Sequence, residues 1–231
     1  MPETNHRLKV LYIAGAGRSG STFLGRILGH PPGFCFVGEI LLATMRLVAS
    51  RVIVGVALDD LDRAHALCGG NATVTRGGAT HRETTIAALG EARAPLVLIH
   101  DVAHPFVTAE LARRVIEIAG LRGAAVAAVA ATAASYRWTD RTPPVRLGGP
   151  GEIWTIRRPL VVPRADFSRG LVGARGDEAI TTILARVGVY TELVPAPSWN
   201  IKITTPEDWD LARAIEGGWD EARDRPFRQV T

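Results

Sequence analysis

The segment that most constrains the fold of this chain is PLVLIHDVAHPFVT, residues 95–108. Its apolar run LVLI is typical of a strand that is buried on both faces of a parallel sheet. His100 and Asp101 follow this run directly, and Thr108 precedes a helical pattern of apolar residues. Because open α/β sheets bind ligands at the carboxyl ends of their strands, His100 and Asp101 are candidate site residues. A strand end capped by solvated polar residues is the alternative interpretation.

The composition favours one α/β domain that acts on a small anionic molecule. The chain has 231 residues, 47% of them hydrophobic, in alternating strand-like and helix-like patterns. The net charge of +4 comes mainly from dispersed arginines, so we expect no nucleic-acid partner. The sequence shows no membrane span or signal peptide, and Cys35 and Cys68 lack metal-ligand spacing. We therefore expect a cytoplasmic protein with no membrane partner.

Two glycine-rich loops are candidate ligand loops. GAGRSGST begins at Gly15, after an apolar strand at residues 10–13, and its backbone N–H groups are placed to hold a phosphate. Its spacing matches a P-loop except that Ser21 replaces the lysine, which disfavours an ordinary ATPase or GTPase. GGATHRET begins at Gly77 and offers the Thr84 hydroxyl at the start of a helix. A simple turn is the alternative interpretation of each loop, and for the Gly77 loop it is the more frequent one.

Three motifs occur in order between residues 52 and 215: GGATHRET, VLIHDVAHPFVTAELARRVIE and NIKITTPEDWDLARAI. Together they resemble the 2-C-methyl-D-erythritol 4-phosphate cytidylyltransferases of isoprenoid biosynthesis and their alditol-phosphate relatives. The third motif also predicts a helix start, with Thr205 as N-cap, Pro206 at the first helical position and Asp208 closing a capping box. The resemblance implies a doubly wound α/β fold with a mostly parallel sheet, of nucleotide-diphospho-sugar transferase type, in a single domain over residues 1–231.

The resemblance also implies a reaction and its partners. Members of that family transfer CMP from CTP to an alditol phosphate such as 2-C-methyl-D-erythritol 4-phosphate and release pyrophosphate, with Mg²⁺ as the implied cofactor. They work as homodimers through a protruding arm, which here corresponds to about residues 133–152. The expected partners are therefore CTP, a phosphorylated small-molecule acceptor and a second copy of the chain.

Matching positions receive roles by the same resemblance. The expected catalytic cations are Lys202, Arg26 and Arg18. The residues expected to bind CTP are Gly15, Ala16, Gly17, Gly78, Thr84 and Asp101. Those expected to bind the acceptor are Asp101, His104 and Thr132. The motifs do not indicate which residues would ligate the metal.

Several positions depart from the family pattern in ways that remove charge or polar groups. They are Ser19, His104, Ala131, Ala134, Pro150, Leu160 and Gly176. His104 stands where the family has an arginine. A neutral imidazole has neither the charge nor the paired N–H donors of a guanidinium group. Arg157 and Arg158 are a candidate source of replacement charge. A catalytically impaired, nucleotide-binding member of the same fold is therefore an alternative function.

The segment GRSGSTFLGRILGHPPGFCFVGEI, residues 17–40, supports one more alternative. It resembles the phosphosulfate loop and first helix of bacterial sulfotransferases, with Arg18, Ser19, Ser21 and Thr22 as the donors. AGAGR, which ends at Arg18, equally matches the opening of the cytidylyltransferase loop. Residues 1–38 are therefore interpreted either as a diverged cytidylyltransferase loop or as a sulfotransferase-like piece.

Overall fold

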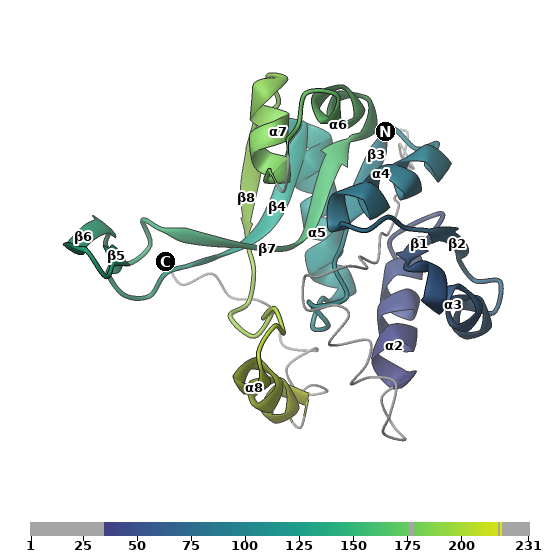
Figure 1. Cartoon of the computed structure of the whole chain (residues 1–231), viewed down its shortest axis with the longest axis horizontal. Helices are drawn as coiled ribbons and strands as arrows, with labels where there is room; N and C mark the ends of the chain where they lie inside the picture. The colour runs from purple at the N-terminus through teal and green to yellow at the C-terminus, as the bar shows by residue number, and fades with distance from the viewer. Residues whose placement is uncertain (1–34, 176–177, 217, 219–231) are drawn as a thin grey trace, which may run out of the picture.

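The computed structural model describes residues 35–175, 178–216 and 218 (Figure 1). Its α-helices are α2 (Cys35–Arg46), α3 (Leu61–Cys68), α4 (His81–Glu91), α5 (Ala109–Arg122), α6 (Arg164–Leu171), α7 (Ile180–Arg186) and α8 (Pro206–Glu216), and a short 3₁₀ helix covers Leu58–Asp60. Its strands are β1 (Ile53–Val56), β2 (Thr73–Arg76), β3 (Leu96–Ile99), β4 (Ala124–Ala130), β5 (Ser135–Thr139), β6 (Thr142–Gly148), β7 (Trp154–Pro163) and β8 (Thr191–Pro195).

The central sheet has four described strands in the order β3-β7-β4-β8. β4 and β8 are parallel, whereas β7 runs antiparallel to both of its neighbours, β3 and β4. The described part of the sheet is therefore mixed, with β7 as its antiparallel strand. The apolar pattern could not reveal this, because a strand buried on both faces has the same pattern in either direction. Among the described strands, β1 and β2 form a parallel pair of their own.

Helices cover both faces of the central sheet, as the doubly wound interpretation requires. On one face, the inward side chains of α2 and α5 pack against Leu98, Val161 and Val194 of the strands. On the other face, α4, α6 and α7 pack against Ile99 and Leu160. The alanine-rich β4 is buried over residues 124–128, so its small side chains allow close packing on both sides.

Patterns of a few adjacent residues predicted the position of β3 and the start of α5 correctly. β3 covers the predicted apolar run, and Thr108 caps α5 by accepting a hydrogen bond from the Leu111 N–H at 3.2 Å. α2 ends at Arg46, although the apolar pattern continues into the turn after it, where Leu47 is 66% exposed.

A β-hairpin extends from the body of the molecule (Figure 1). β5 and β6 pair antiparallel with each other and not with the central sheet. Large apolar side chains along the hairpin are exposed, namely Tyr136, Trp138, Val145 and Leu147. The hairpin lies within the predicted arm, about residues 133–152. Among the described residues, no helix has the length and apolar character needed to cross a membrane.

Candidate active site

Asp101, His104 and Lys202 lie together beyond the carboxyl end of β3. The Lys202 Nζ atom lies 3.6 Å from Oδ2 of Asp101. The Asp101 side chain is 6% exposed, whereas the Lys202 side chain is 37% exposed. The carboxylate is therefore a buried anchor, and the ammonium group remains accessible to a ligand. The structure thus brings together three of the residues that the sequence singled out.

Lys202 is held in place by its neighbours in the chain. The Ile203 N–H donates to the Ala103 carbonyl at 2.8 Å, which joins the loop after β8 to the loop after β3. Ile203 also packs in a small apolar cluster with Phe106 and with Ala212 of α8. This packing fixes the backbone on the C-terminal side of Lys202, so the ammonium group is positioned by a rigid segment.

The start of α8 stabilises the same segment. The Asp208 carboxylate accepts hydrogen bonds from the Thr204 and Thr205 N–H groups at 2.8 and 2.9 Å, and the Asp208 N–H donates to Thr205 Oγ1 at 3.2 Å. The capping box predicted from the sequence is confirmed. Hydrogen bonds from Thr204, and then from Thr205, hold the pKa of Asp208 below its usual range.

Asp101 also shapes its own loop. Its Oδ1 atom accepts the Ala103 N–H at 3.0 Å, while the His104 N–H donates to the Asp101 carbonyl at 2.9 Å. These bonds form a compact turn directly after β3. Within this turn, the Asp101 carboxylate faces Lys202, and His104 is buried with 4% of its surface exposed.

His100 and His104 are neutral under ordinary conditions. Burial lowers the pKa of His100 to about 4. Burial, together with the positive potential of His100, Arg158, Lys202 and Arg157, lowers the pKa of His104 to about 2. An imidazole ring nitrogen of His100 lies 3.0 Å from the His104 carbonyl. His104 therefore contributes hydrogen-bonding atoms to the site but no charge.

Arg157 and Arg158 bring further positive charge from β7. Both are partly buried, and the Asn200 side-chain N–H₂ donates to the Arg158 carbonyl at 2.8 Å. Burial lowers the pKa of Arg158, and the Asp101 carboxylate opposes that shift. Asn200 was not assigned a role from the sequence, although it opens the NIKITTPED motif. Its position in that motif was the signal that could have identified it.

Gly78 and Thr84 lie together in the loop between β2 and α4. The Thr84 hydroxyl accepts the Gly78 N–H at 3.2 Å and donates to the Thr80 carbonyl at 3.1 Å, and Thr84 is fully buried. Thr80 is the N-cap of α4 and forms a capping box with Glu83. In this arrangement, the Thr84 hydroxyl holds the loop.

The loop requires glycine at position 78. A Cβ atom at Gly78 would overlap the Cβ of Glu83. We expect Gly78→Ala to lower the free energy of unfolding by about 1–3 kcal/mol. Gly90→Ala, in α4 where nothing lies within 4 Å, is the control and should raise it by about 0.5–1 kcal/mol. Urea unfolding measures both changes, and equal effects at the two positions would contradict this packing account.

The remaining predicted residues are not joined to these groups. Thr132 is exposed at the base of the hairpin, between β4 and β5. Other residues singled out in the sequence lie outside the described residues, namely Gly15, Ala16, Gly17, Arg18, Ser19, Ser21, Thr22, Arg26 and Gly176.

The described residues offer few groups that could bind a metal. No cluster of three or more His, Cys, Asp or Glu side chains suited to a metal ion occurs among them. Asp101 is the carboxylate beside Lys202, and one of its oxygens already accepts a backbone N–H. This donor set fits Mg²⁺ held mainly by phosphate oxygens, because Mg²⁺ in phosphate-transfer sites commonly takes only one or two protein carboxylates.

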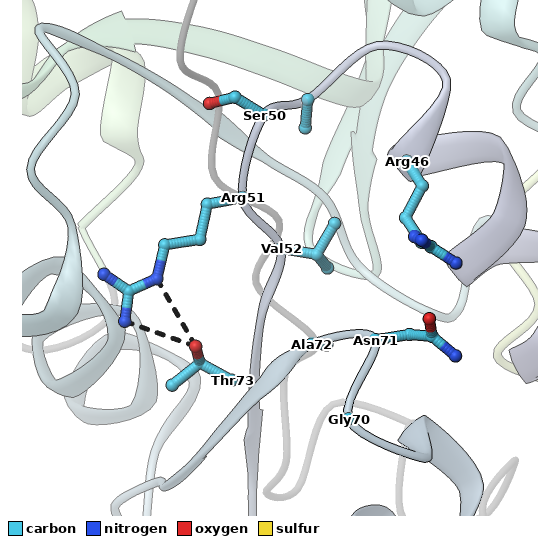
Figure 2. Close-up of a pocket in the computed structure, with 9 residues that line it drawn as sticks. Arg46, Ser50, Arg51, Val52, Gly70, Asn71, Ala72 and Thr73 are labelled. Carbon is cyan, nitrogen blue, oxygen red and sulfur yellow. Dashed lines mark hydrogen bonds between the residues drawn. The ribbon is translucent and has the colours of Figure 1, made fainter.

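A polar cavity of about 400 Å³ lies elsewhere, at the amino ends of β1 and β2 (Figure 2). Figure 2 shows Arg46 and Asn71 on one side of Val52 and Arg51 on the other. The Arg51 guanidinium donates to Thr73 Oγ1 at 3.2 Å and to the Glu91 carbonyl at 3.2 Å. These bonds join β1, β2 and the end of α4. None of the predicted site residues that the structure describes lines this cavity.

Comparisons with known proteins agree with the motifs. The family model for 2-C-methyl-D-erythritol 4-phosphate cytidylyltransferase (IspD) matches residues 39–217. The bifunctional enzyme IspD/IspF of Desulfotalea psychrophila is 30% identical over 171 residues, which cover 71% of this chain and 44% of that protein. The 2-C-methyl-D-erythritol 4-phosphate cytidylyltransferase of Thermus thermophilus is 30% identical over 207 residues, which cover 82% of this chain and 90% of that protein. The chain spans about half the length of several curated relatives that it matches.

Solved structures show the same fold. The crystal structure of 2-C-methyl-D-erythritol 4-phosphate cytidylyltransferase from Thermus thermophilus matches with a TM-score of 0.71 and 25% identity, over 90% of this chain and 98% of that chain. The 4-diphosphocytidyl-2C-methyl-D-erythritol synthase of Anaerococcus prevotii matches with a TM-score of 0.77 and 22% identity, over 91% of this chain and 99% of that chain. The α/β fold predicted from the sequence is confirmed by these structures. The chain belongs to the 2-C-methyl-D-erythritol 4-phosphate cytidylyltransferase family.

Proposed function

We propose that this protein is a CTP-dependent cytidylyltransferase that transfers CMP to 2-C-methyl-D-erythritol 4-phosphate, a step of isoprenoid biosynthesis. The observation that carries the proposal is the cluster at the end of β3. There the accessible Lys202 ammonium group is anchored by the buried Asp101, and Arg157 and Arg158 add positive charge. Such a cluster suits a reaction between two phosphate-bearing substrates. The two substrates, CTP and 2-C-methyl-D-erythritol 4-phosphate, are inferred from membership of the family.

The proposed chemistry is an in-line displacement at phosphorus. An oxygen of the acceptor phosphate forms a bond to the α-phosphorus of CTP, and the bond from that phosphorus to the bridging oxygen of the β-phosphate breaks. Pyrophosphate leaves with the electron pair of that bond. The enzyme must hold two anions in line and stabilise the negative charge that gathers in the transition state. Lys202 supplies this charge at the end of β3, and Asp101 positions Lys202.

Mg²⁺ is part of the proposal as the ion that accompanies CTP. When bound, Mg²⁺ would neutralise the charge of the phosphate oxygens. Among the described residues, Asp101 is the carboxylate of the cluster that would hold the ion. The protein residues then act by position: Asp101 orients Lys202, and the neutral His104 lines the site without adding charge. The N-terminal loop, with Arg18 and Arg26, is proposed to cover the triphosphate.

A comparison of three ligands tests the proposal against its alternatives. Thermal unfolding is measured with CTP·Mg²⁺, ATP·Mg²⁺ and adenosine 3′,5′-bisphosphate. A ligand that binds only the folded protein, at one hundred times its Kd, adds about 2.7 kcal/mol of stability. We expect stabilisation by CTP alone. Stabilisation by the bisphosphate alone would support the sulfotransferase interpretation. No stabilisation by any of the three would support an impaired member of the fold.

The β5–β6 hairpin is proposed to be the arm of a homodimer. An isolated two-stranded hairpin is at best marginally stable in water, and this one exposes Tyr136, Trp138 and Leu147. A second copy of the chain would cover these side chains. A single-domain arrangement over residues 1–231 and a cytoplasmic location complete the proposal. The buried free thiol of Cys68 is consistent with a reducing compartment.

Changing the hairpin surface tests the dimer. Trp138 is 64% exposed, and we expect Trp138→Ala combined with Leu147→Ala to weaken the dimer by about 2–4 kcal/mol, roughly 30- to 1,000-fold in Kd. Light scattering across a concentration series measures the shift. Leu121→Ala, at an exposed position near the end of α5, is the matched control. If the wild-type protein is monomeric at every concentration, the proposal that the hairpin is a dimerisation arm is wrong.

A further inference from the structure

The end of β7 beside the site has an irregular geometry. β4 pairs with β7 through Val126↔Leu160 and then Ala128↔Ile156. The single residue Ala127 of β4 therefore lies opposite three residues of β7, Arg157, Arg158 and Pro159, which form a β-bulge. Bulges redirect side chains and are frequent next to active sites.

The bulge lies beside Asp101. Ile99 pairs with Leu160 in the last pair of the β3–β7 ladder, so Asp101 and Arg158 each lie two residues beyond that pair. The Asp101 charge raises the pKa of Arg158 against the effect of burial, and Arg158 in turn contributes to the low pKa values of His100 and His104. The pairing and the charge interactions thus independently place Arg158 in the cluster.

The cluster has more positive than negative charge. Asp101 is the carboxylate that acts on Arg158, and it is also the ion-pair partner of Lys202. Among the described residues, with Arg157 included, three cationic side chains share one carboxylate, because the two histidines are neutral. Partly buried cations without enough counter-charge favour binding of an anion.

Three buried polar atoms around the cluster also lack a hydrogen-bond partner within the described part of the chain. They are Arg157 Nε, His104 Nδ1 and Asn200 Oδ1. His104 and Asn200 are 4% and 0% exposed, so their unpaired atoms lie inside the protein. Buried polar groups are seldom left unpaired, which indicates that a ligand or ordered water completes these sites. Arg157 Nε is a donor, Asn200 Oδ1 is an acceptor and His104 Nδ1 can be either, a set that suits a ligand with both an anionic group and hydroxyl groups.

We propose that Arg158, supported by Arg157, is the residue that selects the acceptor by binding its tetrahedral dianion, a phosphate or a phosphonate. This proposal rests on the cytidylyltransferase function and adds a residue to its acceptor half. β7 continues from the hairpin, whereas the Gly78 loop belongs to the separate β1–β2 pair (Figure 1). Arg158 is therefore assigned to the acceptor rather than to the base of the nucleotide. The planar guanidinium can bind two oxygens of one anion at once.

Steady-state kinetics with 2-C-methyl-D-erythritol 4-phosphate test the assignment. A charge-assisted hydrogen bond contributes about 1.5–3 kcal/mol, so Arg158→Thr should raise the KM for the acceptor about 10- to 100-fold. The KM for CTP should change less than about threefold, and Arg158→Lys should recover part of the loss. Arg122→Thr, at an exposed position in α5, removes the same charge and is the control. An unchanged acceptor KM, or an equal rise in both KM values, would overturn the proposal.

Binding measurements separate this proposal from the proposed function. If the folded wild-type protein releases no pyrophosphate, the proposed function fails, and titration calorimetry with inorganic phosphate then decides the role of Arg158. Phosphate binding that is lost in Arg158→Thr and kept in Arg122→Thr would support an anion site. Phosphate binding that is absent, or the same in wild type and Arg158→Thr, would refute it. Should Arg158→Thr not fold, Arg158→Gln takes its place in both experiments.

Discussion

Replacing Lys202 by alanine is expected to lower kcat at least about 100-fold. The Lys202 ammonium group is the accessible cation of the cluster, because its side chain is 37% exposed whereas its partner Asp101 is 6% exposed. Loss of one group that stabilises transition-state charge commonly costs about 3–4 kcal/mol, which corresponds to 10²–10³ in rate. Pyrophosphate release at saturating CTP and acceptor measures kcat directly.

Two further variants separate catalysis from folding. Lys202→Arg keeps the charge and should recover part of the rate, although the planar guanidinium group differs in shape from an ammonium group. Arg122→Ala removes an exposed charge from α5 and should leave kcat unchanged. If Lys202→Ala unfolds at the wild-type temperature and retains the wild-type kcat, Lys202 has no role in stabilising the transition state.

Acidification is expected to destabilise the protein strongly. The pKa is lowered to about 4 for His100 and to about 2 for His104, chiefly by burial, whereas an unfolded histidine has a pKa of about 6.5. Below the unfolded value, the unfolded chain binds protons that the folded chain does not. The contribution of both histidines to stability is therefore present above about pH 6.5 and is lost as the pH falls.

The expected loss of stability on acidification can be calculated from these pKa values. Between about pH 7.5 and about pH 5, each histidine should lower the free energy of unfolding by about 2 kcal/mol. Urea unfolding at the two pH values measures the change. His104→Gln cannot take up this proton and should lose about half of the histidine-dependent effect. His65→Gln, at an exposed position in α3, should keep it in full. Equal acid sensitivity in His104→Gln and wild type would contradict the account.

The sequence predicted features that depend on neighbouring residues. β3 follows from four adjacent apolar side chains, and the capping box of Thr205 and Asp208 follows from a spacing of three residues. The positions of Asp101 and Lys202 at one site followed from the family motifs, since about a hundred residues separate them in the chain.

Features that depend on pairing across the chain could not be predicted. The antiparallel direction of β7 arises because the chain returns from the hairpin between β3 and β4, and no local pattern encodes that return. The bulge at Arg157 and Arg158 becomes visible only when the registers of β4 and β7 are compared.

The measurement that tests the central claim most directly is detection of the product. The wild-type protein is incubated with CTP, Mg²⁺ and 2-C-methyl-D-erythritol 4-phosphate, and the mixture is analysed by phosphorus NMR and mass spectrometry. We predict a cytidine diphosphate ester of the acceptor and an equal amount of pyrophosphate, with little product when ATP replaces CTP. A folded protein that forms neither compound from CTP would contradict the cytidylyltransferase function.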